Sequence, residues 1–323
     1  MKDLKGRNIE YLRISVTDKC NLRCIYCMGR EGVRYLPHED LLSYQEIVRV
    51  VRIMTGLGLR SVRLTGGEPM ARRGCLELVR MLGEVEGVER IGMTTNGILM
   101  KGSMLRAKEA GLDSLNISID SLDPLTFSRI TRGGDVEDVL SAIYEALEAG
   151  LRVKLNSVPI AGYNDKEIEK LAALAERLPL EVRFIELMPV GYGAKLQYIP
   201  VDSVKDRIEA AFGPLEPDRE RHGYGPAVYY KPSGFEGSIG FIGAVSHEFC
   251  DSCNRIRITP EGILKLCLNH LKGLDLREPL RSGTSDGELT ELIREAVMKK
   301  PENHGFYQAV KDRETRRMNQ IGG

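Results

Sequence analysis

The sequence predicts an α/β fold built on a parallel sheet, followed by a smaller C-terminal module. Short apolar runs alternate with helix-like segments over the first two-thirds of the chain, and the unusual polar residues come where the apolar runs end. Such alternation is typical of parallel strands joined by right-handed helical crossovers. An open doubly wound sheet and an incomplete (β/α) barrel both fit it, and both place ligands at the carboxyl ends of the strands.

The predicted strands are apolar runs rich in branched residues, and helical periodicity fills the gaps between them. The strands cover residues 11–17, 61–66, 90–96, 114–120, 152–158 and 182–187. The helices cover residues 43–57, 72–84, 101–110, 136–149 and 165–177. Ser43 and Glu46 fit a capping box that opens the first helix, and Gly56 and Gly58 indicate its end.

The pattern changes after residue 213, where prolines and glycines interrupt a polar stretch. We therefore predict a boundary between residues 1–213 and an irregular module at 214–323. This module contains a predicted helix at 287–299 and the second of two cysteine groups.

Charge and hydropathy exclude several classes of protein. The 323 residues contain 46 basic and 46 acidic side chains, so no net field attracts nucleic acid or a membrane surface. No apolar stretch approaches the roughly 20 residues of a membrane span. The N-terminus lacks an apolar signal core, so we expect a cytoplasmic protein.

Seven cysteines without an export signal favour metal or cluster ligation over disulfides. Six of them form two groups of three, and we expect the seventh, Cys75, to be buried and inert. The first group is Cys20, Cys24 and Cys27, spaced CxxxCxxC on one loop. Three thiolates can hold three corners of a [4Fe–4S] cubane and leave one iron open. A zinc site completed by His38 remains an alternative.

Thr65 to Pro69 (TGGEP) follow the second strand directly. Two glycines there let the backbone approach a ligand closely and expose N–H groups, although the same residues are also typical of a plain turn. CxxxCxxC after the first strand, followed by GGEP after the second, resembles the radical S-adenosylmethionine superfamily. A proline commonly follows the third cysteine in that superfamily, whereas this chain has Met28 and Gly29.

This resemblance implies an incomplete (β/α)6 TIM-like barrel whose [4Fe–4S] cluster cleaves S-adenosylmethionine reductively to a 5′-deoxyadenosyl radical. Cys20, Cys24 and Cys27 would then be both metal ligands and catalytic residues. The implied S-adenosylmethionine-binding residues are Tyr26, Gly67, Ser118 and Met188, with Asn156 as a further candidate.

The spacing of the second group, Cys250, Cys253 and Cys267, leaves two interpretations open. His247 or His270 could complete a Cys3His zinc site. A second [4Fe–4S] cluster with an open iron would instead bind a heterocycle nitrogen. If residues 255–258 form a strand, Arg255 and Arg257 share one face, an arrangement that suits a polyphosphate.

CxxCNRIRIT, the spacing to the last cysteine and the terminal Gly-Gly narrow the resemblance to superfamily members that act on GTP in the first step of molybdenum cofactor biosynthesis. In these enzymes the radical takes the 3′ hydrogen of GTP, and C3′ then bonds to C8 of guanine. The resemblance implies two clusters and catalytic roles for Gly322 and Gly323. The implied GTP-binding residues are Arg13, Arg63, Thr94, Lys154, Arg255 and Arg257, with Arg183 as a possible addition.

The resemblance also implies partners: an unidentified one-electron donor, and a cyclic pyranopterin monophosphate synthase that takes the product. A homodimer is left open. Three rival readings remain at this point. A radical peptide or carbohydrate maturase usually carries more downstream cysteines, an iron–sulfur electron carrier does not explain GGEP, and a zinc-stabilised nucleic-acid-binding protein conflicts with the neutral charge and low aromatic content.

Overall fold

Twelve strands form one sheet in the computed structural model, which describes residues 1–220, 222–306 and 313–322. Their order is β12-β11-β10-β1-β2-β3-β4-β5-β6-β9-β8-β7. Every neighbouring pair from β10 through β1 to β6 and β9 is parallel, and the pairs at both ends are antiparallel. The two edge strands do not pair with each other, so the sheet is an incomplete α/β barrel, as predicted.

The first six strands begin and end within two residues of the predicted runs, and a later strand matches the one considered at 255–258, whereas the other five were not predicted. The strands are β1 (Tyr11–Ser15), β2 (Ser61–Thr65), β3 (Arg90–Thr95), β4 (Ser114–Ser118), β5 (Arg152–Ser157), β6 (Glu181–Ile185), β7 (Leu215–Pro217), β8 (Val228–Pro232), β9 (Ser238–Ile242), β10 (Arg255–Ile258), β11 (Ile263–Lys265) and β12 (Leu274–Asp275).

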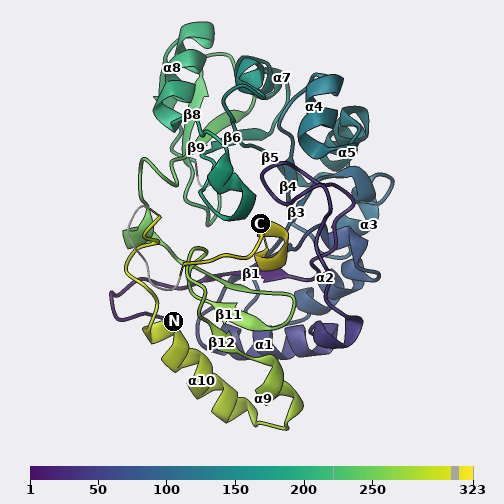
Figure 1. Cartoon of the computed structure of the whole chain (residues 1–323), viewed down its shortest axis with the longest axis vertical. Helices are drawn as coiled ribbons and strands as arrows, with labels where there is room; N and C mark the ends of the chain where they lie inside the picture. Colours follow the sequence, from purple (N-terminus) through teal and green to yellow (C-terminus); the bar gives the residue numbers. More distant parts are fainter. Residues whose placement is uncertain (221, 307–312, 323) are drawn as a thin grey trace.

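Helices cover the outer face of the barrel strands (Figure 1). The helices of the described residues are α1 (Tyr44–Gly56), α2 (Cys75–Gly83), α3 (Met104–Glu109), α4 (Pro124–Thr131), α5 (Val136–Glu148), α6 (Ile168–Ala172), α7 (Leu174–Arg177), α8 (Val201–Phe212), α9 (Arg277–Arg281), α10 (Asp286–Met298) and α11 (Met318–Ile321), the last of which lies inside the barrel instead. Leu12 and Ile14 of β1 are fully buried in the main hydrophobic core, while Arg13 between them lines the interior cavity. This alternation follows from the two-residue period of a strand.

The predicted capping box of α1 is confirmed, since the Ser43 hydroxyl accepts from the Glu46 N–H and the Glu46 carboxylate accepts from the Ser43 N–H. The helix predicted at 165–177 is instead two short helices, α6 and α7, because a 3-10 turn and a break at Ala173 interrupt it. Helix α4 was not predicted. Its signal is Asp123, whose carboxylate caps the N–H of Thr126, followed by Pro124 at the first helical position.

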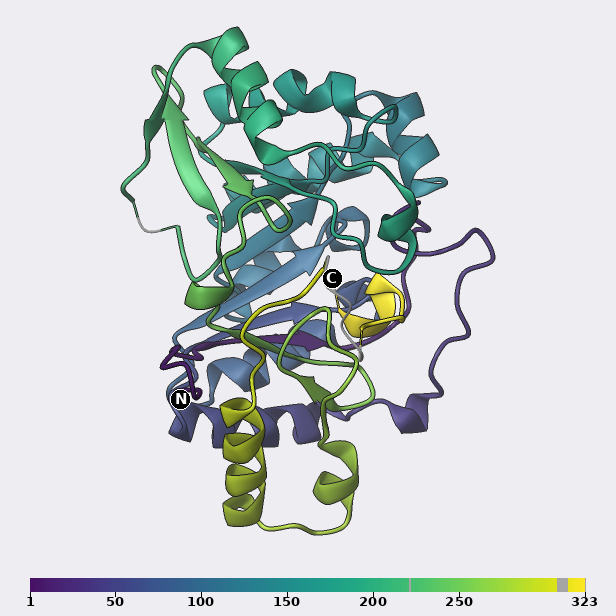
Figure 2. The same cartoon turned by 60° about the vertical axis from the view of Figure 1, so that its left-hand side comes forward.

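Segments after residue 213 extend the sheet of the barrel on both sides. β9 pairs with β6, and β10 pairs with β1 in the register Arg13↔Arg257. The C-terminal helix α11 lies inside the curve of the sheet, beside β1 (Figures 1 and 2). The strands β9 and β10 and the helix α11 therefore border the same interior as the strands β1 to β6.

Candidate active site

The first cysteine group lies on the loop after β1 and faces the interior cavity. Cys20, Cys24 and Cys27 are free of disulfides, and the Cys27 N–H donates to the Cys24 carbonyl (2.9 Å) in a tight turn. Burial, followed by the neighbouring Cys27, Asp120 and Cys20, raises the pKa of Cys24 well above its usual value. Three half-buried thiols whose negative charges would repel one another need a bound cation to ionise, and this donor set fits an iron–sulfur cluster. His38 is exposed and does not line the cavity, so the structure does not place it as a fourth ligand.

The GGEP turn packs directly on this cysteine loop. A Cβ atom on Gly67 would lie 2.4 Å from the Lys19 carbonyl oxygen, and one on Gly66 would lie 2.5 Å from that of Thr17. The Gly67 N–H donates to Thr17 (2.8 Å). The expectation that Gly67 exposes its N–H to a ligand is therefore wrong, because the cysteine loop uses that group. What the glycines provide is close approach of two backbones.

Glu68 is fully buried behind the turn and joins β2 to β3. Its carboxylate accepts hydrogen bonds from the Thr95 hydroxyl (2.8 Å), the Asn96 N–H (2.8 Å) and the Met70 N–H (3.2 Å). Burial outweighs these donors and raises the pKa of Glu68 to about 7. The Asn96 amide in turn donates to the Asn21 side chain (2.8 Å), so the end of β3 is tied to the cysteine loop.

Asp120, just after β4, orients Tyr26 of the cysteine loop. The Tyr26 hydroxyl donates to the Asp120 carboxylate (2.6 Å), whose other oxygen accepts from the Val158 N–H (2.8 Å). Burial raises the pKa of Asp120 to about 6. The ends of β4 and β5 and one residue of the cysteine loop are thus locked together at the rim of the cavity.

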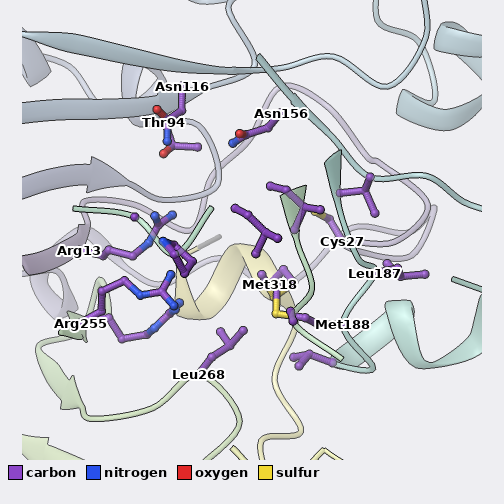
Figure 3. Close-up of a pocket in the computed structure, with 18 of the residues that line it drawn as sticks. Arg13, Cys27, Thr94, Asn116, Asn156, Leu187, Met188, Arg255, Leu268 and Met318 are labelled. Carbon is purple, nitrogen blue, oxygen red and sulfur yellow. The ribbon is translucent and has the colours of Figure 1, made fainter. Parts of the chain in front are cut away.

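All six grouped cysteines line one cavity of about 340 Å³ inside the barrel. The predicted S-adenosylmethionine residues Tyr26, Gly67, Ser118 and Met188 line it, and so does Asn156. Figure 3 shows Thr94, Asn116 and Asn156 along one wall, with Met188 and Met318 on another. Asn116 was not predicted, although it shares the inner face of β4 with Ser118 two residues on.

Three arginines form a positive wall of this cavity: Arg13 on β1, and Arg255 and Arg257 on β10. Figure 3 shows Arg13 and Arg255 side by side. Burial, with the neighbouring Arg13 and Arg255 acting in the same direction, lowers the pKa of Arg257 to about 9. Clustered, buried guanidinium groups favour a bound anion, and their forked donors match phosphate oxygens.

Two predicted cations do not line the cavity. The Arg63 guanidinium donates to the Tyr11 hydroxyl (2.6 Å), the Met93 carbonyl (3.0 Å) and the Ser114 hydroxyl (3.2 Å). The Lys154 ammonium donates to the Glu181 carboxylate (3.0 Å) and to the Tyr229 hydroxyl (3.2 Å). Both side chains therefore bind protein groups here, and a GTP contact for either stays a prediction. Arg183 does line the cavity, where it donates to the Asn156 side chain.

The second cysteine group lies across the cavity from the first, around the start of β10 and the end of β11. His247 is exposed and bonds to Asp202 (2.8 Å), and His270 contacts the Asn303 carbonyl (3.2 Å), so neither completes a zinc site here. The imidazole of His304 lies beside this group, where one of its nitrogens, the Cys250 sulfur and a Glu248 carboxylate oxygen all lie within 4.8 Å of one another. Among the described residues its Nε2 makes no hydrogen bond. No sequence spacing pointed to His304, because it lies 37 residues beyond Cys267 in the chain.

The C-terminal tail enters the barrel at the ends of β1 and β2. The Gly322 carbonyl accepts from Arg257 (2.7 Å), and a Cβ atom on Gly322 would lie 2.8 Å from the Thr65 hydroxyl oxygen. Gly322 has φ +80°, which a residue with a side chain rarely adopts. The other predicted catalytic glycine, Gly323, lies outside the described residues.

Comparisons with known proteins decide the family. A model of the radical SAM superfamily matches residues 14–175, and a model described as Molybdenum Cofactor Synthesis C matches residues 180–306. The chain is 46% identical over 327 residues to a GTP 3′,8-cyclase of Pelotomaculum thermopropionicum, with all of both chains covered. It is 45% identical to the GTP 3′,8-cyclase of Thermodesulfovibrio yellowstonii, again over both whole chains. The chain belongs to the GTP 3′,8-cyclase family.

Solved structures support the fold of this GTP 3′,8-cyclase family member. Streptococcus suis SuiB bound to S-adenosylmethionine matches with a TM-score of 0.64 at 16% identity, covering 92% of this chain and 72% of SuiB. Membership in the radical S-adenosylmethionine superfamily implies one [4Fe–4S] cluster and S-adenosylmethionine. In the part of the chain that the structure describes, no helix has the length and apolar character needed to cross a membrane.

Proposed function

We propose that this chain converts GTP to (8S)-3′,8-cyclo-7,8-dihydroguanosine 5′-triphosphate, the first step of molybdenum cofactor biosynthesis. The observation that carries the proposal is one cavity lined by both cysteine groups and by the three arginines of β1 and β10. Full-length identity of 46% to a curated GTP 3′,8-cyclase supports the same reaction. A peptide or carbohydrate maturase gains no comparable support, since the likeness to SuiB extends only to the fold.

At the first group, Cys20, Cys24 and Cys27 would hold a cluster that supplies the electron for cleavage of S-adenosylmethionine. Tyr26, fixed by Asp120, and Gly67, packed on the cysteine loop, border the space beside this cluster. Ser118, Met188 and Asn156 line the same cavity. We assign these residues to binding S-adenosylmethionine, with its adenosyl group directed into the barrel.

At the second group, Cys250, Cys253 and Cys267 would hold a second [4Fe–4S] cluster with one iron open to the guanine base. The triphosphate would then meet Arg13, Arg255 and Arg257, and Thr94 lines the same cavity. Arg63 and Lys154 reach GTP only if they exchange the protein acceptors that they hold here. Gly322, held by Arg257, brings the tail against the same anion site.

The electron balance of the overall reaction shows which further partner the enzyme needs. Hydrogen leaves C3′ of GTP for the 5′-deoxyadenosyl group, the C3′–C8 bond forms, and one electron and one proton complete the product. Two electrons are therefore consumed per turnover, one of them in the cleavage of S-adenosylmethionine, and both must come from an external one-electron donor. We assign the chain to the cytoplasm, with hand-off of the product to a cyclic pyranopterin monophosphate synthase, and a homodimer remains open.

The test is anaerobic reconstitution followed by single-turnover assay. Two [4Fe–4S] clusters correspond to about 8 irons per chain. The reduced protein should form 5′-deoxyadenosine from S-adenosylmethionine only when GTP is present, and GTP deuterated at C3′ should transfer deuterium to it. Formation that is independent of GTP, without deuterium transfer, would contradict the proposal.

A further inference from the structure

Lys300 is a buried lysine beside the second cysteine group that no predicted role covers. It follows α10, is 8% exposed, and lines the cavity together with Cys253 and Cys267. Its ammonium donates to the carbonyl oxygens of Arg255 (2.9 Å) and Leu266. Arg255 lies two residues after Cys253, and Leu266 directly precedes Cys267. One side chain thus ties together the two chain segments that carry these cysteines.

The charge on Lys300 is not neutralised by a carboxylate in the described residues, because both of its acceptors are neutral carbonyls. Burial lowers the pKa of Lys300, and the sulfurs of Cys253 and Cys267 oppose that effect. The same charge acts on the cysteines. Burial opposes ionisation of Cys253, but Lys300 and then Arg255 outweigh it and lower the pKa of Cys253 to about 7.

The main chain at Lys300 is itself fixed by Arg7. The Arg7 guanidinium donates to the carbonyls of Pro301 (2.7 Å), Lys300 (3.3 Å) and Cys250 (2.9 Å), and it pairs with Asp3 (2.6 Å). Arg7 is 7% exposed. These hydrogen bonds connect the 300–302 segment to Cys250, the cysteine of the group that Lys300 itself does not reach. The ammonium of Lys300 therefore has a defined position relative to all three segments that carry the cysteines.

We propose that Lys300 is the positioning residue of the second cysteine group and that its charge raises the reduction potential of the cluster held there. The inference rests on the proposed second cluster. Reduction adds one negative charge to a cluster, and a fixed positive charge in a poorly hydrated site stabilises that reduced form. The first group has the opposite surroundings, since the acidic side chains Glu68 and Asp120 lie beside Cys20 and Cys24.

The experiment uses the full chain with Cys20, Cys24 and Cys27 all changed to Ala, so that only the second cluster gives a signal. In this background, Lys300→Met, Lys300→Arg and Lys299→Met are compared by redox titration followed by electron paramagnetic resonance. Lys299 is exposed and adjacent, so Lys299→Met is a matched control for the same change. Iron content and the dissociation constant for GTP are measured on each protein.

Lys300→Met should lower the midpoint potential by at least a tenfold change in the reduction equilibrium, about 59 mV for one electron. Lys300→Arg and Lys299→Met should leave it unchanged. If Lys300→Met loses its iron while Lys300→Arg keeps both iron and potential, the positioning role is equally supported.

Three results would overturn the inference: an unchanged potential in Lys300→Met, equal shifts in Lys300→Met and Lys300→Arg, or a loss of GTP binding in Lys300→Met at unchanged potential. A background protein without any iron would remove the second cluster itself and the proposed function with it. An intact cluster signal whose midpoint potential is the same with and without Lys300 would contradict only this inference.

Discussion

At the scale of single residues, charged side chains of opposite sign stand beside the two cysteine groups, which gives the site an acidic half and a basic half. Glu68 and Asp120 stand behind the first cysteine group, while Arg13, Arg255, Arg257 and Lys300 surround the second. The acidic side chains make the electrostatic potential near the first group more negative, and the basic side chains near the second group attract an anion. This division matches a site where one end donates an electron and the other holds a triphosphate.

A substitution at Arg257 tests whether the basic half binds the triphosphate. Arg257→Ala removes a charged donor from the proposed triphosphate site, and hydrogen bonds to charged groups contribute about 1.5–3 kcal/mol. GTP affinity should therefore fall about tenfold or more, because 1.4 kcal/mol is a factor of ten. Equilibrium binding to the iron-loaded protein measures this, with Arg52→Ala on the exposed side of α1 as the control. Loss of iron instead of affinity would make the role of Arg257 structural.

Glu68 tests the acidic half through pH. Its pKa is about 7 in the folded chain against 4.5 for an ordinary glutamate, so the folded state binds the proton more tightly. Stability of the metal-free protein should then fall as pH rises from 4.5 to 7, by up to ~1.4 kcal/mol per pH unit from this group. Urea denaturation at several pH values measures the slope. Glu68→Gln should flatten it, and an identical slope in the variant would show that Glu68 does not titrate in this range.

At the scale of elements, short backbone motifs bring the strand ends into contact. The GGEP turn after β2 touches the cysteine loop after β1 through backbone atoms alone, so its geometry depends on the absence of a Cβ atom. The capping box of α1 and the Asp123 cap of α4 are equally local. Local chemistry of this kind is readable from sequence, which is why β1 to β6 and α1 were predicted to within two residues at each end, while α4 and the short strands β7, β8, β9, β11 and β12 were not predicted.

Gly67→Ala tests the close packing of the turn. Its new Cβ atom would meet the Lys19 carbonyl at 2.4 Å, a contact that the backbone must move to relieve. We expect loss of stability of about 1–3 kcal/mol, as for overpacking in a core, together with reduced iron at the first cluster. Gly56→Ala, where no atom lies within 4 Å, is the matched control and should be neutral or slightly stabilising. Equal iron content in Gly67→Ala and Gly56→Ala would show that the packing of the turn does not affect iron binding by the first cysteine group.

At the scale of the whole molecule, a buried ionic network holds the C-terminal tail in the barrel. Lys265 of β11 pairs with Glu314, and both side chains are fully buried. Arg316 joins Glu314 (3.1 Å) to Glu261 (2.7 Å). Asn319 donates to the Asp18 carbonyl (2.9 Å) on the cysteine loop. The tail thereby connects the second cysteine group, through β11, to the first.

Breaking this network should be costly unless both charges are removed. Glu314→Gln leaves the buried Lys265 charge unpaired, which costs about 3–5 kcal/mol, whereas Lys265→Met should cost less because Arg316 still pairs with Glu314. The double variant should cost less than the sum, as a double-mutant cycle from chemical denaturation measures. The exposed pair Arg294 and Glu291 is the control, expected at about 0–1 kcal/mol. Additive costs for Lys265 and Glu314 would show that the tail is held by other contacts.

The sequence by itself determined the strand–helix alternation, the loop positions of both cysteine groups and the matching faces of Arg255 and Arg257. Each of these depends on spacing between near neighbours, which a chain carries in one dimension. Three features could be learned only from the folded chain. β10 pairs with β1, and Arg63 and Lys154 donate to protein groups. Lys300 and His304 stand beside cysteines some 33 to 54 residues earlier in the chain. Those contacts arise when the barrel closes its walls around a shared interior, and no local pattern in the chain encodes which distant side chains meet there.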